Sequence, residues 1–199
     1  SHTAVMTMYE AFMKSPVFKK DRQVDNWIRE NLNQANDFIY SKSLKNPNER
    51  GMGTTAVGVI KAHIGTFIFN VGDSRIYADY NNELIQMSED HSVIAQLLKE
   101  GKITSEEAKT HPKKNTLTNA LGVWHVFRID INKIENTYKY LLVSSDGLHG
   151  YVEKKVISDI VHDESLSLQE KVDTLIARAN QSGGYANCSI ILMENDGEQ

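Results

Sequence analysis

The chain has little of what marks secreted, membrane and disulfide-stabilised proteins. Its single cysteine, Cys188, excludes an internal disulfide. Its longest apolar runs, such as residues 140–143 and 189–193, are far shorter than the roughly 20 residues that a membrane-spanning helix needs. No charged-then-apolar leader opens the sequence. These absences predict a protein of the reducing cytoplasm that has no contact with a membrane.

Charge and composition exclude two further classes. A net charge of −4 over 199 residues gives no reason to expect binding to nucleic acid. The 40% of hydrophobic residues suffices for a core and argues against intrinsic disorder. No repeat or linker divides the sequence, so we expect one domain over residues 1–199. The chain starts with Ser1 rather than methionine, inside a predicted helix, which suggests a longer natural polypeptide.

The hydrophobic pattern predicts clustered strands and helices. Helices are expected over residues 5–12, 21–43, two short stretches within 91–111, 153–162 and 168–181. Strands are expected over residues 54–62, 64–71, 75–80, 84–87, 126–134, 138–144 and 188–194. Asn81-Asn82 suits a tight hairpin turn, and Thr104 and Ser167 each open a capping box. Because strands cluster rather than alternate with helices, the fold class is predicted to be α+β with antiparallel sheets.

Two carboxylates follow predicted strands. Asp73 lies in Asn70-Val71-Gly72-Asp73-Ser74-Arg75, where the chain turns back, and Asp146 follows the apolar strand that ends at Ser144. Carboxylates at strand ends can hold a hard cation such as Mg²⁺ or Mn²⁺. Taken alone, Asp73 is more simply interpreted as an ordinary turn residue. For Asp146, a turn residue and a metal ligand are equally good interpretations.

Two other motifs carry less chemistry by themselves. Gly183-Gly184-Tyr185-Ala186-Asn187 is a glycine-rich entry to the last strand and has no titratable group that suits a metal. Residues 89–122 contain Glu89-Asp90-His91-Ser92 and form a helical insert between strands, which is typical of a mobile flap. His91 could carry a proton or bind a ligand, although a histidine or aspartate at a helix start is more often structural.

In this order and spacing, the motifs resemble bacterial metal-dependent serine/threonine phosphatases of the protein phosphatase type 2C family. The matching pieces are Gly51-Met52-Gly53-Thr54-Thr55, Asn70 to Arg75, Glu89-Asp90-His91-Ser92, Gly101-Lys102-Ile103-Thr104, His111-Pro112, Ala120-Leu121-Gly122, Ser145-Asp146-Gly147-Leu148 and Gly183-Gly184 with Asn187. The resemblance covers essentially the whole chain.

The resemblance implies an αββα sandwich of two antiparallel sheets flanked by helix pairs, with two or three Mn²⁺ or Mg²⁺ ions at one end. It implies that metal-activated water attacks the phosphorus of phosphoserine or phosphothreonine in line. Asp146 would contact two of these ions and Asp73 one. The flap, with Asp90, His91 and Asn115, would lie beside the substrate. Phosphorylated proteins and a cognate serine/threonine kinase would be the partners.

Two departures from the family pattern bear on activity. The family's N-terminal strands, with their acidic motifs, are absent before Ser1, and the last metal aspartate of the family is replaced by Ala186. A cluster of divalent cations needs several carboxylates, so Asp73 and Asp146 alone should bind metal weakly. The sequence therefore predicts a phosphatase that is impaired in this form.

Two alternatives remain. A pseudophosphatase would keep the fold and bind a phosphoprotein or a regulator without catalysis, as Ala186 suggests. A regulatory phosphatase of the sporulation or sigma-factor type is the weaker alternative, because the flap-like segment argues against it.

Overall fold

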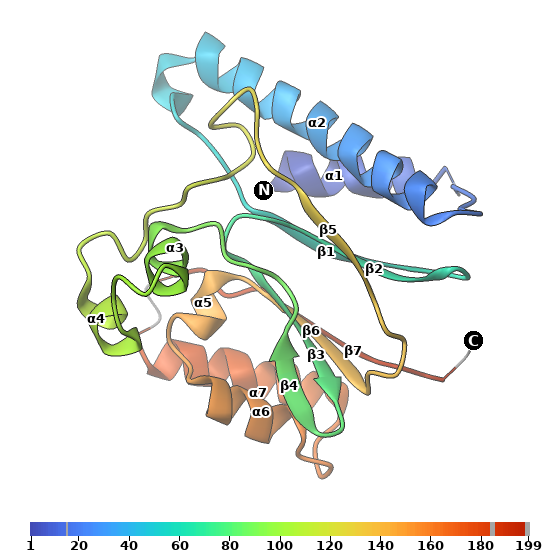
Figure 1. Cartoon of the computed structure of the whole chain (residues 1–199), viewed down its shortest axis with the longest axis vertical. Coiled ribbons are helices and arrows are strands. Elements are labelled where there is room, and N and C mark those ends of the chain that lie inside the picture. Colours follow the sequence, from blue (N-terminus) through green and yellow to red (C-terminus); the bar gives the residue numbers. More distant parts are fainter. Residues whose placement is uncertain (15, 184–185, 198–199) are drawn as a thin grey trace. The chain divides into compact units, whose positions relative to one another are not determined.

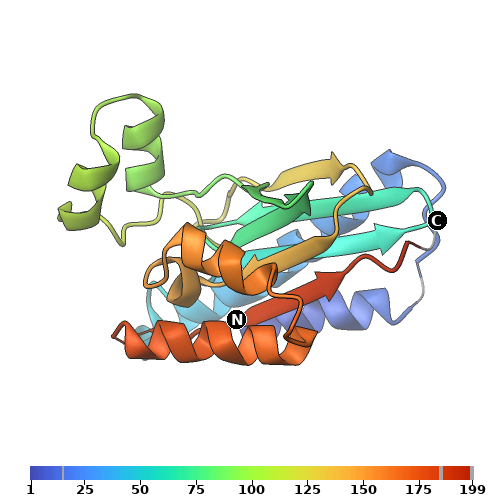
Figure 2. The same cartoon turned by 90° about the horizontal axis from the view of Figure 1, so that it is seen from below.

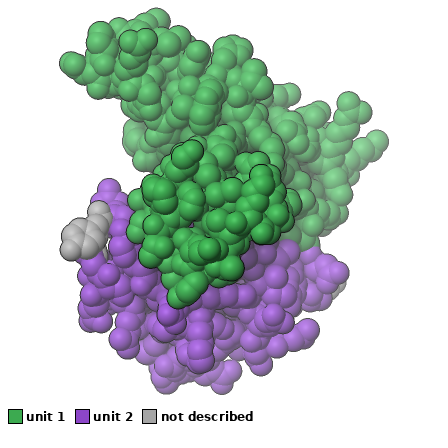
Figure 3. Space-filling view, turned by 60° about the vertical axis from the view of Figure 1, so that its left-hand side comes forward, with its two compact units in different colours: residues 1–73, 89–134 green, residues 74–88, 135–199 purple. Residues whose placement is uncertain are grey.

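The computed structural model describes residues 1–14, 16–183 and 186–197 and divides into two compact units (Figure 3). The first unit comprises Ser1–Asp73 and Glu89–Ile134, and the second comprises Ser74–Ser88 and Glu135–Gln199. Within the described ranges, the strands form one antiparallel sheet in each unit. The predicted α+β class with two antiparallel sheets is therefore confirmed. None of the helices in these ranges is long and apolar enough to span a bilayer.

The first unit is a three-stranded sheet with a long helix along one face (Figure 1). Its elements are α1 (His2–Phe12), α2 (Asp21–Lys45), the 3-10 turn η1 (Pro47–Glu49), β1 (Ala56–Ala62), β2 (Gly65–Val71), α3 (Val93–Lys99), α4 (Ser105–Thr110) and β5 (Asp130–Ile134). The strand order is β1-β2-β5. Helix α2 buries residues at helical spacing, among them Ile28 and Leu32, in one core with Phe67 and Phe69 of β2. Each such aliphatic side chain contributes about 1.5–3 kcal/mol by leaving water.

The second unit is a four-stranded sheet with its own helices. Its elements are β3 (Arg75–Tyr80), β4 (Glu83–Gln86), β6 (Tyr140–Ser144), α5 (Asp146–His149), α6 (Lys154–Val161), α7 (Leu168–Gln181) and β7 (Ile190–Glu194). The strand order is β4-β3-β6-β7. Leu142 of β6, Ile157 of α6 and Leu175 of α7 belong to one buried core, so both long helices of this unit pack against its sheet.

Several local predictions are confirmed. Asn81 and Asn82 join β3 to β4 with φ of 55° and 63°, the left-handed conformation that a two-residue hairpin turn requires. Thr104 and Ser167 form the predicted capping boxes with Glu107 and Glu170.

Several strand boundaries and one helix differ from the prediction; among them, β1 begins at Ala56 instead of residue 54 and β6 at Tyr140 instead of residue 138. Strand β5 begins at Asp130 instead of residue 126, because the N–H and C=O of Arg128 bond to the Asn119 side chain rather than to a neighbouring strand. Strand β7 begins at Ile190 instead of residue 188. The short helix α5, which directly follows the turn after β6, was not predicted.

We expect Ser167→Ala to lower the free energy of unfolding by about 1 kcal/mol, because the Ser167 hydroxyl caps the Glu170 N–H at the start of α7. Urea denaturation monitored by circular dichroism measures this loss. Thr174→Ala is the matched control, since its hydroxyl bonds only to a carbonyl in the helix interior, and it should change stability by less than about 0.5 kcal/mol. Equal effects of the two substitutions would contradict the capping role.

Candidate functional site

The turn between β2 and β3 presents Asp73. Gly72, directly before it, has φ of +106°, and a Cβ at this position would collide with the Thr55 side chain. Only glycine is compatible with both the backbone conformation and this contact. Asp73 itself is half-buried. The local geometry therefore fixes the backbone from which the Asp73 carboxylate projects.

The backbone N–H and C=O of Gly72 are both bound by residues at the start of the flap segment. The Gly72 N–H donates to Nδ1 of His91 at 3.1 Å, and the Gly72 C=O accepts from the His91 N–H at 2.9 Å. The side chain of Asn70 donates to the C=O of Gly72 and of Glu89, at 3.0 and 2.8 Å. Gly72 is therefore tied to His91 by two direct hydrogen bonds and to Glu89 through the side chain of Asn70.

His91 is only 3% exposed and is held on its other side by Asp130. Its Nε2 lies 2.9 Å from Oδ2 of Asp130, which also accepts from Arg128 at 2.8 Å. Burial raises the pKa of Asp130, but the hydrogen bond from His91 and the charge of Arg128 outweigh it, so the pKa lies below its ordinary value. The Asp130 carboxylate is thus held in its charged form beside His91.

The flap segment of residues 89–122 contains α3 and α4, which lie beyond one end of the strands of their own unit (Figure 2). Its two ends are joined at the base. Val93 N–H bonds to the C=O of Thr116, and Thr118 N–H bonds to the C=O of His91, both at 2.9 Å. Farther out, Asn115 is exposed, whereas Asp90 at the base is half-buried. The flap is therefore a closed loop whose neck passes through His91.

In the second unit, Asp146 begins α5 beside the segment that precedes β7. The Ser145 hydroxyl accepts from Ser189 N–H at 3.0 Å and donates to the C=O of Asn187 at 3.2 Å. A Cβ on Gly147 would collide with the Asn187 backbone. Burial, and then the charge of Asp146, raises the pKa of the Cys188 thiol. The backbone next to Ala186 therefore runs against the turn that carries Asp146.

His149, the last residue of α5, is not suited to proton transfer near neutral pH. Burial lowers its pKa to about 3, with a smaller contribution from the charge of Arg75. At neutral pH its imidazole is uncharged, and its Nδ1 is buried without a hydrogen-bond partner.

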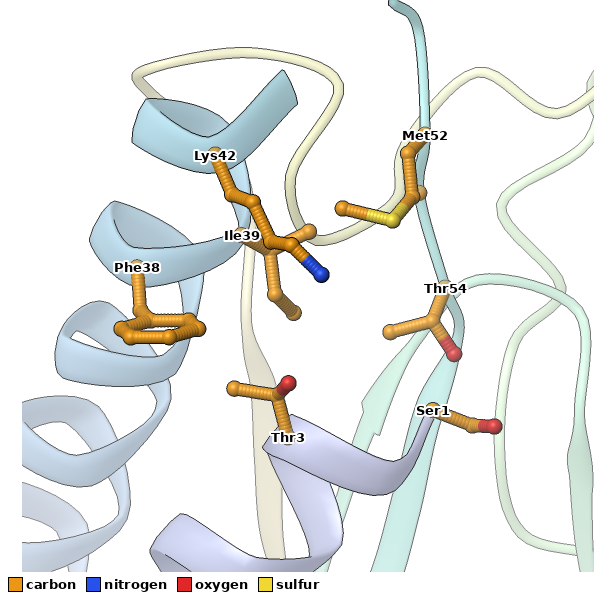
Figure 4. Close-up of a pocket in the computed structure, with 8 residues that line it drawn as sticks. Ser1, Thr3, Phe38, Ile39, Lys42, Met52 and Thr54 are labelled. Carbon is orange, nitrogen blue, oxygen red and sulfur yellow. The ribbon is translucent and has the colours of Figure 1, made fainter. Parts of the chain in front are cut away.

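A small pocket in the first unit is not a candidate for phosphate binding (Figure 4). Its volume is about 50 Å³, too small for a phosphorylated side chain. Ser1, Thr3, Phe38, Ile39, Lys42, Met52, Gly53 and Thr54 line it. The cation of Lys42 is paired with Glu49 at 3.2 Å, and the lining offers no carboxylate for a metal.

The predicted site residues fall into separate local groups. Asp73, Asp90, His91 and Asn115 belong to the first unit, and Asp146 and Ala186 belong to the second. In the described part of the chain, no three histidine, cysteine or acidic side chains gather closely enough to hold a metal. Gly184 and Tyr185 of the glycine-rich motif lie outside the described residues.

Sequence reasoning missed the roles of Asn70, Asn119 and Asp130. Asn119 bonds to both backbone groups of Arg128, and its Nδ2 lies 2.7 Å from His91 Nδ1. A polar residue in an otherwise apolar strand, such as Asn70 in β2, could have indicated this role, since a buried side-chain amide needs hydrogen-bond partners. Nothing in the spacing of Asp130 indicated that His91 would be its partner.

Comparison with known proteins places this architecture in one family. The chain is 36% identical to the serine/threonine phosphatase Stp of Listeria welshimeri over 98% of its own length and 78% of that protein. It is 33% identical to the protein phosphatase PhpP of Streptococcus pneumoniae over 88% of its length and 71% of that protein.

Solved structures agree. The serine/threonine phosphatase Stp1 from Staphylococcus aureus superposes with a TM-score of 0.89 at 31% identity, over 99% of this chain and 77% of that one. A bacterial serine phosphatase gives the same TM-score and identity over 100% of this chain and 80% of that one. The family model described as protein phosphatase 2C matches residues 1–189, and the chain therefore belongs to the protein phosphatase 2C family.

Proposed function

We propose that this protein is a metal-dependent phosphatase that removes phosphate from phosphoserine and phosphothreonine in proteins. The observation that carries the proposal is the match to Stp at 36% identity over nearly the whole chain. Phosphorylated proteins are then its substrates, and the kinase that makes them is its functional partner. Nucleic acid and membranes are not partners in this proposal, and the cytoplasm is its compartment.

Asp73 and Asp146 are the proposed metal ligands. Each carboxylate follows a residue whose position is fixed by hydrogen bonds. Gly72, before Asp73, is bound by His91, and Ser145, before Asp146, is bound by Ser189. Carboxylate oxygen is the donor that Mn²⁺ and Mg²⁺ prefer. The two or three ions of an intact family site would supply the positive charge that binds phosphate and activates water. The fit is incomplete, because the methyl group of Ala186 offers no donor where the family pattern has an aspartate.

The protein's own residues have two further roles in this proposal. Residues 1–199 act as one domain, and the flap of residues 89–122 shapes access to the phosphate. On the flap, the exposed side chain of Asn115 is free to meet a protein substrate, whereas Asp90 and His91 belong to the neck. The flap would then select among phosphoproteins without taking part in phosphorus–oxygen cleavage.

A pseudophosphatase is the second candidate, and Ala186 is the observation that favours it. With one carboxylate fewer, any two divalent metal ions bound at the site would keep more uncompensated positive charge. That charge would attract the phosphate group of a phosphoprotein, so the protein would bind phosphoproteins even without hydrolysing them.

We expect Ala186→Asp to tighten Mn²⁺ binding by about tenfold or more, because it adds a carboxylate beside the turn of Asp146. Isothermal titration calorimetry with MnCl₂ measures the dissociation constant. Ala186→Asn is the matched control, since it adds the same volume with a weaker donor and no charge. Equal Mn²⁺ affinity of the two variants would argue against a metal site at this position.

We expect Ala186→Asp to give Mn²⁺-dependent hydrolysis of a phosphothreonine peptide. Adding Asp146→Asn should lower that rate by about a hundredfold or more. Malachite-green detection of released phosphate measures both rates. Peptide binding without turnover in every variant would favour the pseudophosphatase, and neither binding nor turnover would defeat both candidates.

A further inference from the structure

We propose that His91 is a positioning residue that sets the orientation of the Gly72 peptide, and through it the Asp73 carboxylate, so that the flap neck and the Asp73 turn move as one body. The inference rests on the proposed function only in taking Asp73 as a metal ligand.

The first step is the pair of bonds between His91 and Gly72. The imidazole accepts from the Gly72 N–H at 3.1 Å, while the His91 backbone donates to the Gly72 C=O at 2.9 Å. Gly72 is thus held on both sides of its Cα, because its N–H belongs to the peptide group with Val71 and its C=O to the peptide group with Asp73. The imidazole fixes the first of these peptide groups, and the backbone N–H of His91 fixes the second, in which the Asp73 backbone starts.

The second step concerns which imidazole nitrogen carries the proton. A backbone N–H is always a donor, so the contact with Gly72 requires Nδ1 of His91 to accept. The Asn119 amide nitrogen, 2.7 Å from the same atom, also donates. The proton therefore lies on Nε2 and is donated to Asp130 at 2.9 Å. The Asp130 carboxylate selects the tautomer that can hold Gly72, as a second carboxylate does for metal-bound histidines.

The third step links this contact to the flap. The C=O of His91 accepts from the N–H of Thr118, and the next residue, Ser92, pairs with Leu117 in an isolated bridge. The outgoing and returning strands of the flap neck thus meet at His91. Displacement of the flap neck would be transmitted to the Gly72 peptide by short contacts between buried groups.

Three substitutions distinguish the acceptor role of Nδ1 from the donor role of Nε2. His91→Asn places an amide oxygen near the position of Nδ1 and can still accept from Gly72. His91→Gln places an amide N–H near the position of Nε2 and can still donate to Asp130, but it has no acceptor at the position of Nδ1. His91→Ala removes both functions. Asparagine and glutamine therefore serve as each other's control.

The experiment is amide hydrogen exchange by NMR on the metal-free protein, with the Gly72 rate expressed relative to that of Phe69 in the centre of β2. The ratio removes any general loss of stability, which would speed both amides. We expect His91→Asn to keep the ratio within about threefold of the unsubstituted protein, and His91→Gln and His91→Ala to raise it by about tenfold or more. Ser92→Ala, which removes the cap of α3 in the same segment, should leave it unchanged.

Two results of these NMR measurements would overturn the inference. One is an equal ratio in His91→Asn and His91→Gln. The other is a set of imidazole ¹⁵N shifts in the unsubstituted protein that places the proton on Nδ1. The second measurement needs no variant, so the proposal stays testable even if a variant fails to fold.

A titration with MnCl₂ then tests the link to Asp73. The Mn²⁺ concentration that half-broadens the Asp73 amide signal should be the same in His91→Asn as in the unsubstituted protein and severalfold higher in His91→Gln. Equal midpoints in both variants would overturn the positioning role. Absence of broadening in the unsubstituted protein would instead defeat Asp73 as a metal ligand, while the exchange ratios would still decide the role of His91.

Discussion

Gly72 is the residue at which the first unit's sheet, turn and flap constrain one another. Its N–H and C=O are bound by His91, and Asn70 joins the same C=O to Glu89. These groups are buried, so each bond that is lost would leave a polar atom without water, at a cost of about 1–3 kcal/mol. The conformation of the turn therefore depends on partners distant in sequence as well as on its glycine.

The turn that carries Asp146 in the second unit is held by different contacts. Asp146 is exposed at the start of a short helix, and its turn is held by the Ser145 hydroxyl and by close backbone approach at Gly147. This arrangement places the alanine position of the glycine-rich segment near a fixed negative charge. In the proposed metal site, a divalent ion would be stabilised by the sum of several such charges, and the methyl group of Ala186 adds none.

Local chemistry made much of the fold predictable. The Asn81-Asn82 turn and the capping boxes of Thr104 and Ser167 depend on residues close in sequence, and the structure has all three. Strand β5 was extended too far because the side chain of Asn119, nine residues away, takes the backbone bonds of Arg128. At the site, motifs indicated Asp73 and Asp146, but the pairing of His91 with Asp130 depends on tertiary contacts that no spacing rule contains.

The division of the chain between two sheets also has a kinetic consequence. Hairpin β3–β4 separates two parts of the first unit in sequence, yet β3 pairs with β6, which follows only after the flap and β5. During synthesis the hairpin leaves the ribosome well before its partner strand exists, and two strands alone are marginally stable in water. The side chains of β3 that are buried in the folded protein, such as Ile76 and Tyr77, therefore stay exposed in the nascent chain until β6 emerges.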